Sequence, residues 1–574
     1  MNTTGADTTA LPASLRAWVE GSSGSRLLAR ALEVAAQAER DGHACARLEA
    51  DPQSLAELRR HPWISDGSTP GAAVIDETGR IFFWRNWVHE QRIAEAIRAR
   101  VASAEIAVDA HTEGAIEALF SGVPADLRPR AQRQINAVRG SLGKRFFVLS
   151  GGPGTGKTTT VLRMLLIRQR MAMRAGGVPL AMALAAPTGK AAQRLSQAVR
   201  DGAARLRDAL GERAADWQAA FEHLPEAACT LHRLLGSNPR EDRHAHDAER
   251  PLEHDLVVVD EASMVDLGLM RALLDALRPD AALILVGDPD QLVSVGEGSV
   301  LADIVAVAEA GGFTGHHLRL TENWRTSELG GVYEAVRLGD AAALRAAVDA
   351  APRSVLLKEV RDQRALAELL ECWVARPEWA ALDAAIDGDP DQVERAFAAL
   401  RTLQLLTALR SGPYGSESLN PWIDQRRRRR YGDRLWYPGR PVLVRGNDYT
   451  RRLFNGDVGI ALPEGARMAV CFEYTDESGV ARHRFLSTQE LPDHDLGYAL
   501  TVHKSQGSEY RHVALLLPPQ TEHRILSRQL LYTGVSRAKA GLEIWSDPQS
   551  LAKALARVTE RAGGLRERLG YRPA

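Results

Sequence analysis

The stretch RFFVLSGGPGTGKTTT (145–160) decides the fold of this chain of 574 residues. The apolar run FFVL (146–149) predicts a buried strand, and the residues after Thr158 predict a helix. Between them, GGPGTGKT (151–158) fits the pattern G-x-x-x-x-G-K-[ST]. In a strand–loop–helix context, such a loop cradles phosphate groups with its backbone N–H groups. The sequence therefore predicts a phosphate-binding loop.

This loop defines a candidate ATP site. The Lys157 ammonium can reach the β- and γ-phosphates, and the Thr158 hydroxyl can ligate Mg²⁺. A glycine-rich turn without a ligand is the alternative, and the flanking strand and helix argue against it. The residues expected to bind ATP here are Gly151, Gly152, Pro153, Gly154, Thr155, Gly156, Lys157, Thr158 and Thr159.

An acidic pair follows a second apolar run, LVVVDEASM (256–264). Asp260 is expected to hold the Mg²⁺, and Glu261 to orient or deprotonate the attacking water. Acidic residues after a strand are also common at helix N-termini. Because this pair follows a phosphate-binding loop in the chain, the catalytic interpretation is favoured.

Three further segments each place a polar side chain near the end of a strand or helix. ALILVGDPDQLVSVGEG (282–298) carries Gln291, which could sense the γ-phosphate. LTENWRTSE (320–328) carries Arg325, and LLYTGVSRAKAG (530–541) carries Arg537. An arginine there can neutralise the charge that develops on a transferred phosphate, so Lys157, Glu261, Gln291, Arg325 and Arg537 form the expected catalytic set.

Short apolar runs of this kind recur along the chain and predict an α/β fold with parallel sheets. They fall into two groups, before and after about residue 330, with helical patterns between them. The segment 438–490 instead has short alternating strands and Asn-Gly turns, which predict a small β-barrel. The first 110 residues are mainly helical in pattern, with one hairpin in AAVIDETGRIFFWRNW (72–87). The expected units are 1–110, 111–330, 331–437 with 491–574, and the 438–490 insertion.

Composition narrows the functional class. The net charge of −1 gives no global basic field, so a nucleic-acid site must be a local groove. RRRRR (426–430) follows a helical pattern and is expected to be a solvated face. The four cysteines include no CxxC pair, which argues against a zinc site and favours the cytoplasm. Neither a signal peptide nor a membrane-spanning run is predicted.

Taken in order, the motifs resemble those of the superfamily 1 helicases. They are GGPGTGKT, APTGKAAQRL, TLHRLLG, VVVDEASM, VGDPDQL, LTENWRT, YALTVHKSQGSEY and LYTGVSRAK. TLHRLLG, GDPDQLVSVGEG and LFNGDVGI resemble more closely the RecD family, the α subunits of RecBCD (exodeoxyribonuclease V) complexes. The clear motifs run from Gln134 to Trp545. Trp324, Ser536 and Lys539 are mild departures from the usual pattern.

This resemblance implies two RecA-like motor domains, with an SH3-like barrel inserted in the second and an N-terminal domain that docks on partners. It implies an ATP- and Mg²⁺-dependent DNA helicase that moves 5′ to 3′ and processes double-strand ends for recombinational repair. The expected partners are DNA and RecB-like and RecC-like subunits, with the nuclease in another subunit. A standalone superfamily 1 repair helicase is the main alternative, and an inactive ATPase scaffold is a third.

The resemblance also assigns residues outside the phosphate-binding loop. Gln134 is expected to read adenine, and Gln506 and Gly507 to couple to the nucleotide. YALTVHKSQGSEY (498–510) is expected to lie at a helix start that faces both ATP and DNA. A structural role for His503 is the alternative. The residues expected to contact DNA are Thr188, Gly189, Lys190, Thr230, His232, Thr501 and His503.

Overall fold

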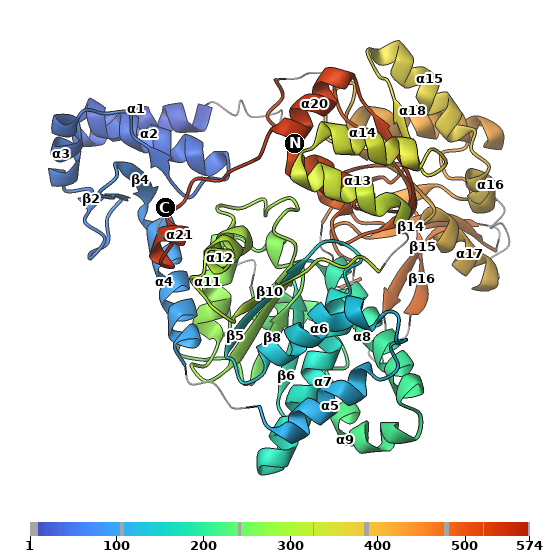
Figure 1. Ribbon diagram of the computed structural model, residues 1–574. Coiled ribbons are helices and arrows are strands. Elements are labelled where there is room, and N and C mark those ends of the chain that lie inside the picture. Colours follow the sequence, from blue (N-terminus) through green and yellow to red (C-terminus); the bar gives the residue numbers. More distant parts are fainter. Residues whose placement is uncertain are drawn as a thin grey trace.

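The computed structural model of the chain is a mixed α/β protein (Figure 1). It describes residues 10–103, 108–238, 243–324, 327–383, 390–446, 448, 450–451, 453–465, 467–475, 481–519 and 522–571. In these ranges no helix is long and apolar enough to cross a membrane.

The first parallel sheet has six strands within the described ranges, in the order β10-β5-β9-β8-β6-β7. All of its neighbouring strands pair in parallel. Its strands are β5 (Phe146–Gly151), β6 (Met182–Ala186), β7 (Cys229–Thr230), β8 (Leu256–Val259), β9 (Ala282–Gly287) and β10 (His317–Leu320). The central strands are buried on both faces, which explains why they appear in the sequence as continuous apolar runs.

Helices cover both faces of this sheet (Figure 1). Phe146 and Val148 of β5 point into one apolar core, and Phe147 and Leu149 into the other. The first core contains α4 (Trp84–Val101), α11 (Leu267–Ala276), α12 (Val300–Glu309) and α21 (Leu565–Arg568). The second contains α5 (Ala110–Phe120), α6 (Arg128–Ser141), α7 (Lys157–Gly176), α8 (Gly189–Leu210) and α9 (Gln218–Glu222).

The second parallel sheet has five strands in the part of the chain that is described, ordered β11-β20-β19-β12-β18. They are β11 (Val355–Lys358), β12 (Leu403–Thr407), β18 (Ala499–Thr501), β19 (Tyr510–Leu516) and β20 (Ala538–Trp545). One face packs on α13 (Ser327–Leu338), α14 (Ala341–Ala350), α19 (Arg528–Val535) and α20 (Pro548–Ala556). The other packs on α15 (Gln363–Val374), α16 (Glu378–Asp383), α17 (Pro390–Leu400) and α18 (Ser416–Arg428).

An antiparallel sheet is inserted between α18 and β18. Its order is β16-β15-β14-β13-β17, with β13 (Pro441–Val444), β14 (Val458–Glu464), β15 (Arg467–Thr475), β16 (Ala481–Ser487) and β17 (His494–Leu496). Ile460, Leu462 and Cys471 pack against the second parallel sheet, so the insertion shares that core. The short strands are those expected from the sequence, while closure into an SH3-like barrel stays a prediction.

The N-terminal unit, defined here as residues 10–83, combines helices with a four-stranded sheet, β1-β4-β3-β2. It contains α1 (Ala10–Ser23), α2 (Arg26–Arg40), α3 (Pro52–Arg60), β1 (Ala46–Arg47), β2 (Ile64–Ser65), β3 (Ala73–Ile75) and β4 (Arg80–Phe83). The expected hairpin is confirmed, because β3 and β4 pair antiparallel around a turn where Gly79 has φ +80°. The apolar stripe of α2 closes a core of its own, as its pattern predicts.

The C-terminal tail, residues 557–571, leaves α20 and crosses to the other side of the molecule (Figure 1). There α21 packs beside α4, where the Glu90 carboxylate accepts the Gly564 N–H at 2.9 Å and lies 3.2 Å from Arg568. Since Ile93 and Ile97 of α4 belong to the core of the first parallel sheet, α4 is part of that core and not of the N-terminal unit.

The arginine run 426–430 differs from the expected solvated face. Arg427 is fully buried, with its guanidinium 4.9 Å from the centre of the Trp379 ring, while Arg429 and Arg430 are exposed. The expectation is therefore wrong at Arg427, because aromatic residues distant in sequence cover this side of α18.

Candidate active site and nucleic-acid interface

The phosphate-binding loop joins β5 to α7, as the sequence predicts. Gly154 and Gly156 have φ of +75° and +83°, a region that side chains other than glycine seldom adopt. The Lys157 ammonium donates to the carbonyls of Gly151 at 2.7 Å and Gly152 at 3.0 Å. This loop is therefore already curled, with its cation folded onto it.

A cavity of about 390 Å³ opens above the loop, between the two parallel sheets. We call it the P-loop cavity. Its volume lies in the usual range for small-molecule sites. The sequence-predicted residues that line it are 153–159, Asp260, Glu261, Gln291, Gly507 and Arg537.

Asp260 and Glu261 sit where β8 ends, on the floor of this cavity. Burial and the Glu261 carboxylate raise the pKa of Asp260, and the Lys157 ammonium opposes this shift. Glu261 has φ +51°, a left-handed conformation that is costly for a residue with a side chain. With the Thr158 hydroxyl, these carboxylates form an oxygen donor set of the kind Mg²⁺ prefers.

Gln291 and Arg537 meet across the cleft between the sheets. The Arg537 guanidinium donates to Gln291 Oε1 at 2.9 Å, and the Gln291 amide donates to the Asp288 carboxylate at 3.1 Å. The Tyr532 hydroxyl donates to the same Asp288 oxygen at 3.0 Å and lies against Gly152. A series of buried hydrogen bonds thus joins α19, which packs on the second sheet, to the loop after β9 of the first sheet. Arg325, the other predicted arginine, lies outside the described residues.

The predicted adenine-reading residue lies beside the phosphate-binding loop. Gln134, on α6, is buried and donates to the Thr155 carbonyl at 3.2 Å. Trp324 lines the P-loop cavity near the same point, and its backbone N–H donates to the Gly154 carbonyl at 2.9 Å. In the sequence, Trp324 is only a departure from the usual pattern, and no role is predicted for it.

Two further lining residues were also missed. Arg194 reaches the cavity from α8, donates to the Gly507 carbonyl and forms an ion pair with Glu509 at 3.0 Å. Arg194 stands in APTGKAAQRL and Glu509 in YALTVHKSQGSEY, so the motifs contained both signals.

A second cavity, of about 410 Å³, lies beside β18. We call it the His503 cavity, and it is lined by Thr501, His503 and Lys504 together with Asn420 and Asp495, among others. The segment 498–510 therefore contributes to both cavities, because Gly507 and Glu509 line the P-loop cavity. Gln506 lies in the chain between Lys504 and Gly507. Its side-chain amide donates to the Leu292 carbonyl, in the loop after β9, at 3.2 Å.

The local structure of this segment differs from the expected helix start. β18 is followed by a single 3-10 turn, His503–Ser505, and the chain then leaves in extended form at Gln506. The expectation of a helix start is therefore wrong here, because one such turn is too short to act as a helix N-terminus. Burial, and next the Arg561 guanidinium, lower the pKa of His503, so its ring is neutral near pH 7.

The other predicted DNA contacts sit at helix starts of the first sheet. The hydroxyl oxygen of Thr188 caps α8 by accepting the Ala191 N–H at 3.2 Å. The Thr230 hydroxyl oxygen caps α10 (Leu231–Leu234), where His232 lies, by accepting the Arg233 N–H at 3.1 Å.

The inserted sheet reaches one of these helix starts. The Phe454 ring lies against Gly189 so closely that an added Cβ would be 3.2 Å from it. Burial raises the pKa of the neighbouring Asp457 to about 6, while the Phe454 N–H and the Lys190 ammonium oppose that shift. The turn of LFNGDVGI therefore covers the start of α8.

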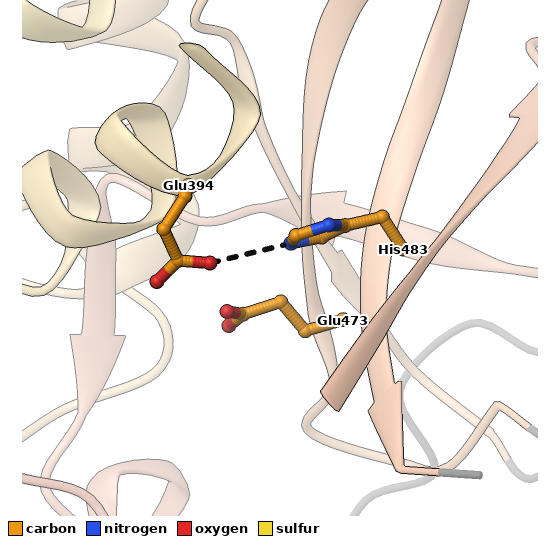
Figure 2. A group of neighbouring side chains, drawn as sticks. All are labelled: Glu394, Glu473 and His483. Atoms are coloured by element: carbon orange, nitrogen blue, oxygen red, sulfur yellow. Dashed lines mark ion pairs between the residues drawn. The ribbon is translucent and has the colours of Figure 1, made fainter. Parts of the chain in front are cut away.

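A cluster of residues that line neither cavity has side chains of the kind that bind metal ions. Glu394, Glu473 and His483 place ligand atoms within 4.8 Å of one another (Figure 2). The Arg401 guanidinium already lies 2.7 Å from Glu473 and 3.4 Å from Glu394. We therefore assign an ion-pair cluster that joins α17 to the inserted sheet.

Comparison with known proteins agrees with this geometry. Residues 134–297 match a family model described as an AAA domain, and residues 496–544 match a UvrD-like helicase C-terminal domain. The RecBCD enzyme subunit RecD of Mycobacterium tuberculosis is 36% identical, over 96% of this chain and 92% of its own. This chain belongs to the RecD family of helicases.

One further relative and one solved structure are less similar to this chain. The ATP-dependent RecD2 DNA helicase of Deinococcus radiodurans is 30% identical, over 85% of this chain and 58% of its own. Among solved structures, Bacteroides Pif1 bound to ssDNA aligns with a TM-score of 0.33 at 16% identity, over 72% of this chain and 91% of that one. As a member of the RecD family, this chain is an ATP-dependent DNA helicase.

Proposed function

We propose that this chain is the 5′-to-3′ motor subunit of a helicase–nuclease complex that processes double-strand DNA ends for recombinational repair. The observation that carries the proposal is that one segment, 498–510, lines both the P-loop cavity and the His503 cavity. A motor must link the state of its nucleotide to its grip on the strand. A segment shared between the two sites provides that link.

In the P-loop cavity, the Lys157 ammonium leaves the loop carbonyls and holds the β- and γ-phosphates of ATP. Glu261 accepts a proton from the attacking water. The water oxygen bonds to the γ-phosphorus as the bond between that phosphorus and the ADP oxygen breaks. Arg537, with Arg325, neutralises the charge that develops on the transferred group. Mg²⁺, held by Thr158 and Asp260, would supply further charge neutralisation at the phosphates.

The nucleotide must break the contact between Gln291 and Arg537 if both are to face the γ-phosphate. In the structure the Arg537 guanidinium donates to Gln291 Oε1 at 2.9 Å. ATP binding thus replaces a bond between the sheets with bonds through the phosphate. Gln506 senses the same change because it binds the Leu292 carbonyl, next to Gln291.

For the DNA strand, we propose a path across the helix starts of the first sheet and the His503 cavity of the second. Thr188, Gly189, Lys190, Thr230, His232, Thr501 and His503 would contact its backbone. Hydroxyl, amide and imidazole groups contact phosphates with little dependence on base sequence. That is what movement along any strand requires.

The domain arrangement stays part of this proposal. We assign 111–330 and 331–437 with 491–574 to two RecA-like motor domains, and 438–490 to an SH3-like barrel, with three adjustments: α4 and α21 pack in the core of the first sheet, and β17 pairs with the inserted sheet. We assign residues 1–110 to docking on RecB-like and RecC-like subunits in a cytoplasmic complex, with DNA cleavage in another subunit. The RecD relatives that are matched over 92–93% of their own length, at 36% identity, support the subunit over the standalone alternative.

Unwinding of duplexes with a single 5′ or 3′ tail tests this function. The complex purified from its native cell should unwind from a 5′ tail through this subunit, and a Glu261→Gln variant should bind ATP without unwinding from that tail. A variant that unwinds only 3′-tailed duplexes would contradict the direction. Active chain that never co-purifies with other subunits would instead favour the standalone helicase.

A further inference from the structure

The loop between β9 and α12, residues 288–299, carries Gln291 and has irregular backbone. Leu292 inserts into the apolar core of the second sheet, and its N–H donates to the Thr533 hydroxyl oxygen at 2.8 Å. Val295, three residues on, is 87% exposed. The loop therefore crosses to the second sheet and returns, and groups outside it must fix its course.

One arginine of the C-terminal tail holds the returning half of this loop. The Arg561 guanidinium donates to the Ser294 carbonyl at 2.6 Å and to the Gly298 carbonyl at 3.0 Å, and it also bonds the Gly296 carbonyl. Three carbonyls of one irregular loop thus converge on a single planar donor. A lysine cannot reproduce this set, because its ammonium lacks the rigid fork of a guanidinium.

The same guanidinium lies against the N-terminal unit. A Cβ built on Gly42 would be 2.7 Å from Arg561 Cζ. The Gly298 N–H donates to the Gly42 carbonyl at 2.9 Å, and the Ala44 N–H donates to the Ala562 carbonyl at 2.8 Å. Loop, tail and N-terminal unit therefore meet around one side chain.

We propose that Arg561 is a positioning residue for ATP hydrolysis, which sets the loop carrying Gln291 and makes that setting depend on the N-terminal unit. This inference rests on the proposed function, since it concerns the same hydrolysis. Arg561 touches neither phosphate nor water in this scheme. It acts through the backbone of residues 294–298, and a partner that shifts the N-terminal unit would act on Gln291 along the same route.

The expected consequence is a loss of turnover with little change in nucleotide binding. A displacement of about 1 Å at a catalytic group can reduce rate by about a hundredfold. Lys157 and the rest of the phosphate-binding loop do not contact Arg561, so the KM for ATP should change little. This separation of kcat from KM is not expected of a residue that only stabilises the fold.

Arg561→Ala in the full chain is the first test. DNA-stimulated kcat should fall about ten- to a hundredfold, and Arg561→Lys should recover only part of it. Arg524→Ala is the matched control, since Arg524 also bridges the second half of the chain to the N-terminal unit, through an exposed pair with Asp41 at 3.0 Å. That control should keep the wild-type kcat.

The second test uses substitutions in the N-terminal unit. Gly42→Ala should push on the guanidinium and lower kcat, whereas Gly24→Ala, at φ +69° with nothing within 4 Å, adds similar backbone strain without that contact. The losses from Gly42→Ala and Arg561→Ala should be less than additive in the double variant, because both act on one loop.

The outcomes separate this inference from the proposed function. Wild-type chain without DNA-stimulated ATP turnover would overturn both. Active wild type with an unchanged kcat in Arg561→Ala would overturn the inference alone. If Arg561→Ala does not fold, equal kcat for Gly42→Ala and Gly24→Ala would overturn it instead.

Discussion

The P-loop cavity and the His503 cavity share one segment of chain, yet they hold their polar side chains in different ways. In the P-loop cavity, Lys157 bonds two carbonyls, and Arg537 bonds Gln291 and the carbonyls of Thr533 and Ser508. In the His503 cavity, Lys504 lies 3.5 Å from Asp495, a long contact between half-buried groups. Lys157 and Arg537 are thus held by several shorter bonds, which ATP would replace, whereas Lys504 has a long contact to its acidic neighbour.

This difference corresponds to two physical tasks. Phosphoryl transfer needs charges that are already in position when the transition state forms. Grip on a sliding strand needs many contacts of similar, modest strength, because a strong fixed contact would stop movement. Substitutions in the P-loop cavity should therefore change turnover by orders of magnitude, and those along the DNA path should change affinity by small factors.

The largest effect is expected from Lys157→Gln. The variant should lose ATP hydrolysis, by more than about 10³-fold, because it removes the cation expected on the β- and γ-phosphates. Steady-state ATPase in saturating single-stranded DNA measures this. Lys144→Gln, a surface change whose ammonium bonds the Gly315 carbonyl, is the control. Turnover near the wild-type rate would show that ATP is not hydrolysed in the P-loop cavity.

Arg537→Ala should come next, with kcat reduced about 10³-fold and nucleotide affinity changed far less. An arginine finger acts mainly on charge that appears in the transition state. Nucleotide binding by fluorescence titration, set beside single-turnover hydrolysis, measures the split. Because Arg537 is buried and also bonds backbone carbonyls, a thermal unfolding curve must accompany both. Lost affinity with preserved turnover at saturation would make Arg537 a ground-state ligand.

Lys190→Ala should weaken single-strand binding and reduce its salt dependence. Removing one phosphate contact lowers the slope of log K against log salt by roughly 0.7 for a single strand. Basal ATPase should stay at the wild-type level, since Lys190 does not line the P-loop cavity. Binding measured across a salt series decides this, and an unchanged slope would place Lys190 off the strand.

His503→Ala should have the smallest effect on DNA affinity, and its effect should not depend on salt. Its lowered pKa keeps the ring neutral near pH 7, so the variant should lose affinity without a change in salt slope. Burial lowers the pKa of His503, so the wild-type ring gains its proton at a lower pH than an ordinary histidine. DNA affinity equal to wild type at every salt concentration would identify His503 as a structural residue.

Local motifs predicted the site better than they predicted its surroundings. The loop 151–158, the acidic pair 260–261 and Gln291 each follow a strand that the sequence marks clearly, and the structure gathers residues 153–158, the acidic pair and Gln291 in one cavity. Their chemistry depends on neighbours within a few residues. A single sequence therefore sufficed to group them, while their roles in ATP hydrolysis stay predictions.

The missed features depend on contacts between distant residues. Arg427 is buried because Trp379 and Tyr498 cover it, and a helical pattern of five arginines contains no sign of either. The turn at Phe454 meets Gly189, which lies much earlier in the chain, so its sequence predicted a turn but not its location. The helix start expected after Thr501 came from the family resemblance, and the structure has a single 3-10 turn there instead.

The central claim is that the segment 498–510 couples nucleotide state to strand grip, and Gln506→Ala tests it most directly. Single-strand affinity should be measured with and without a non-hydrolysable ATP analogue, in the wild type, in Gln506→Ala and in a Gln218→Ala control, which removes an exposed bond to Glu222. Wild type and control should change affinity by about tenfold on binding the analogue, and Gln506→Ala should lose most of this shift while still binding both ligands. An equal shift in all three would contradict the account.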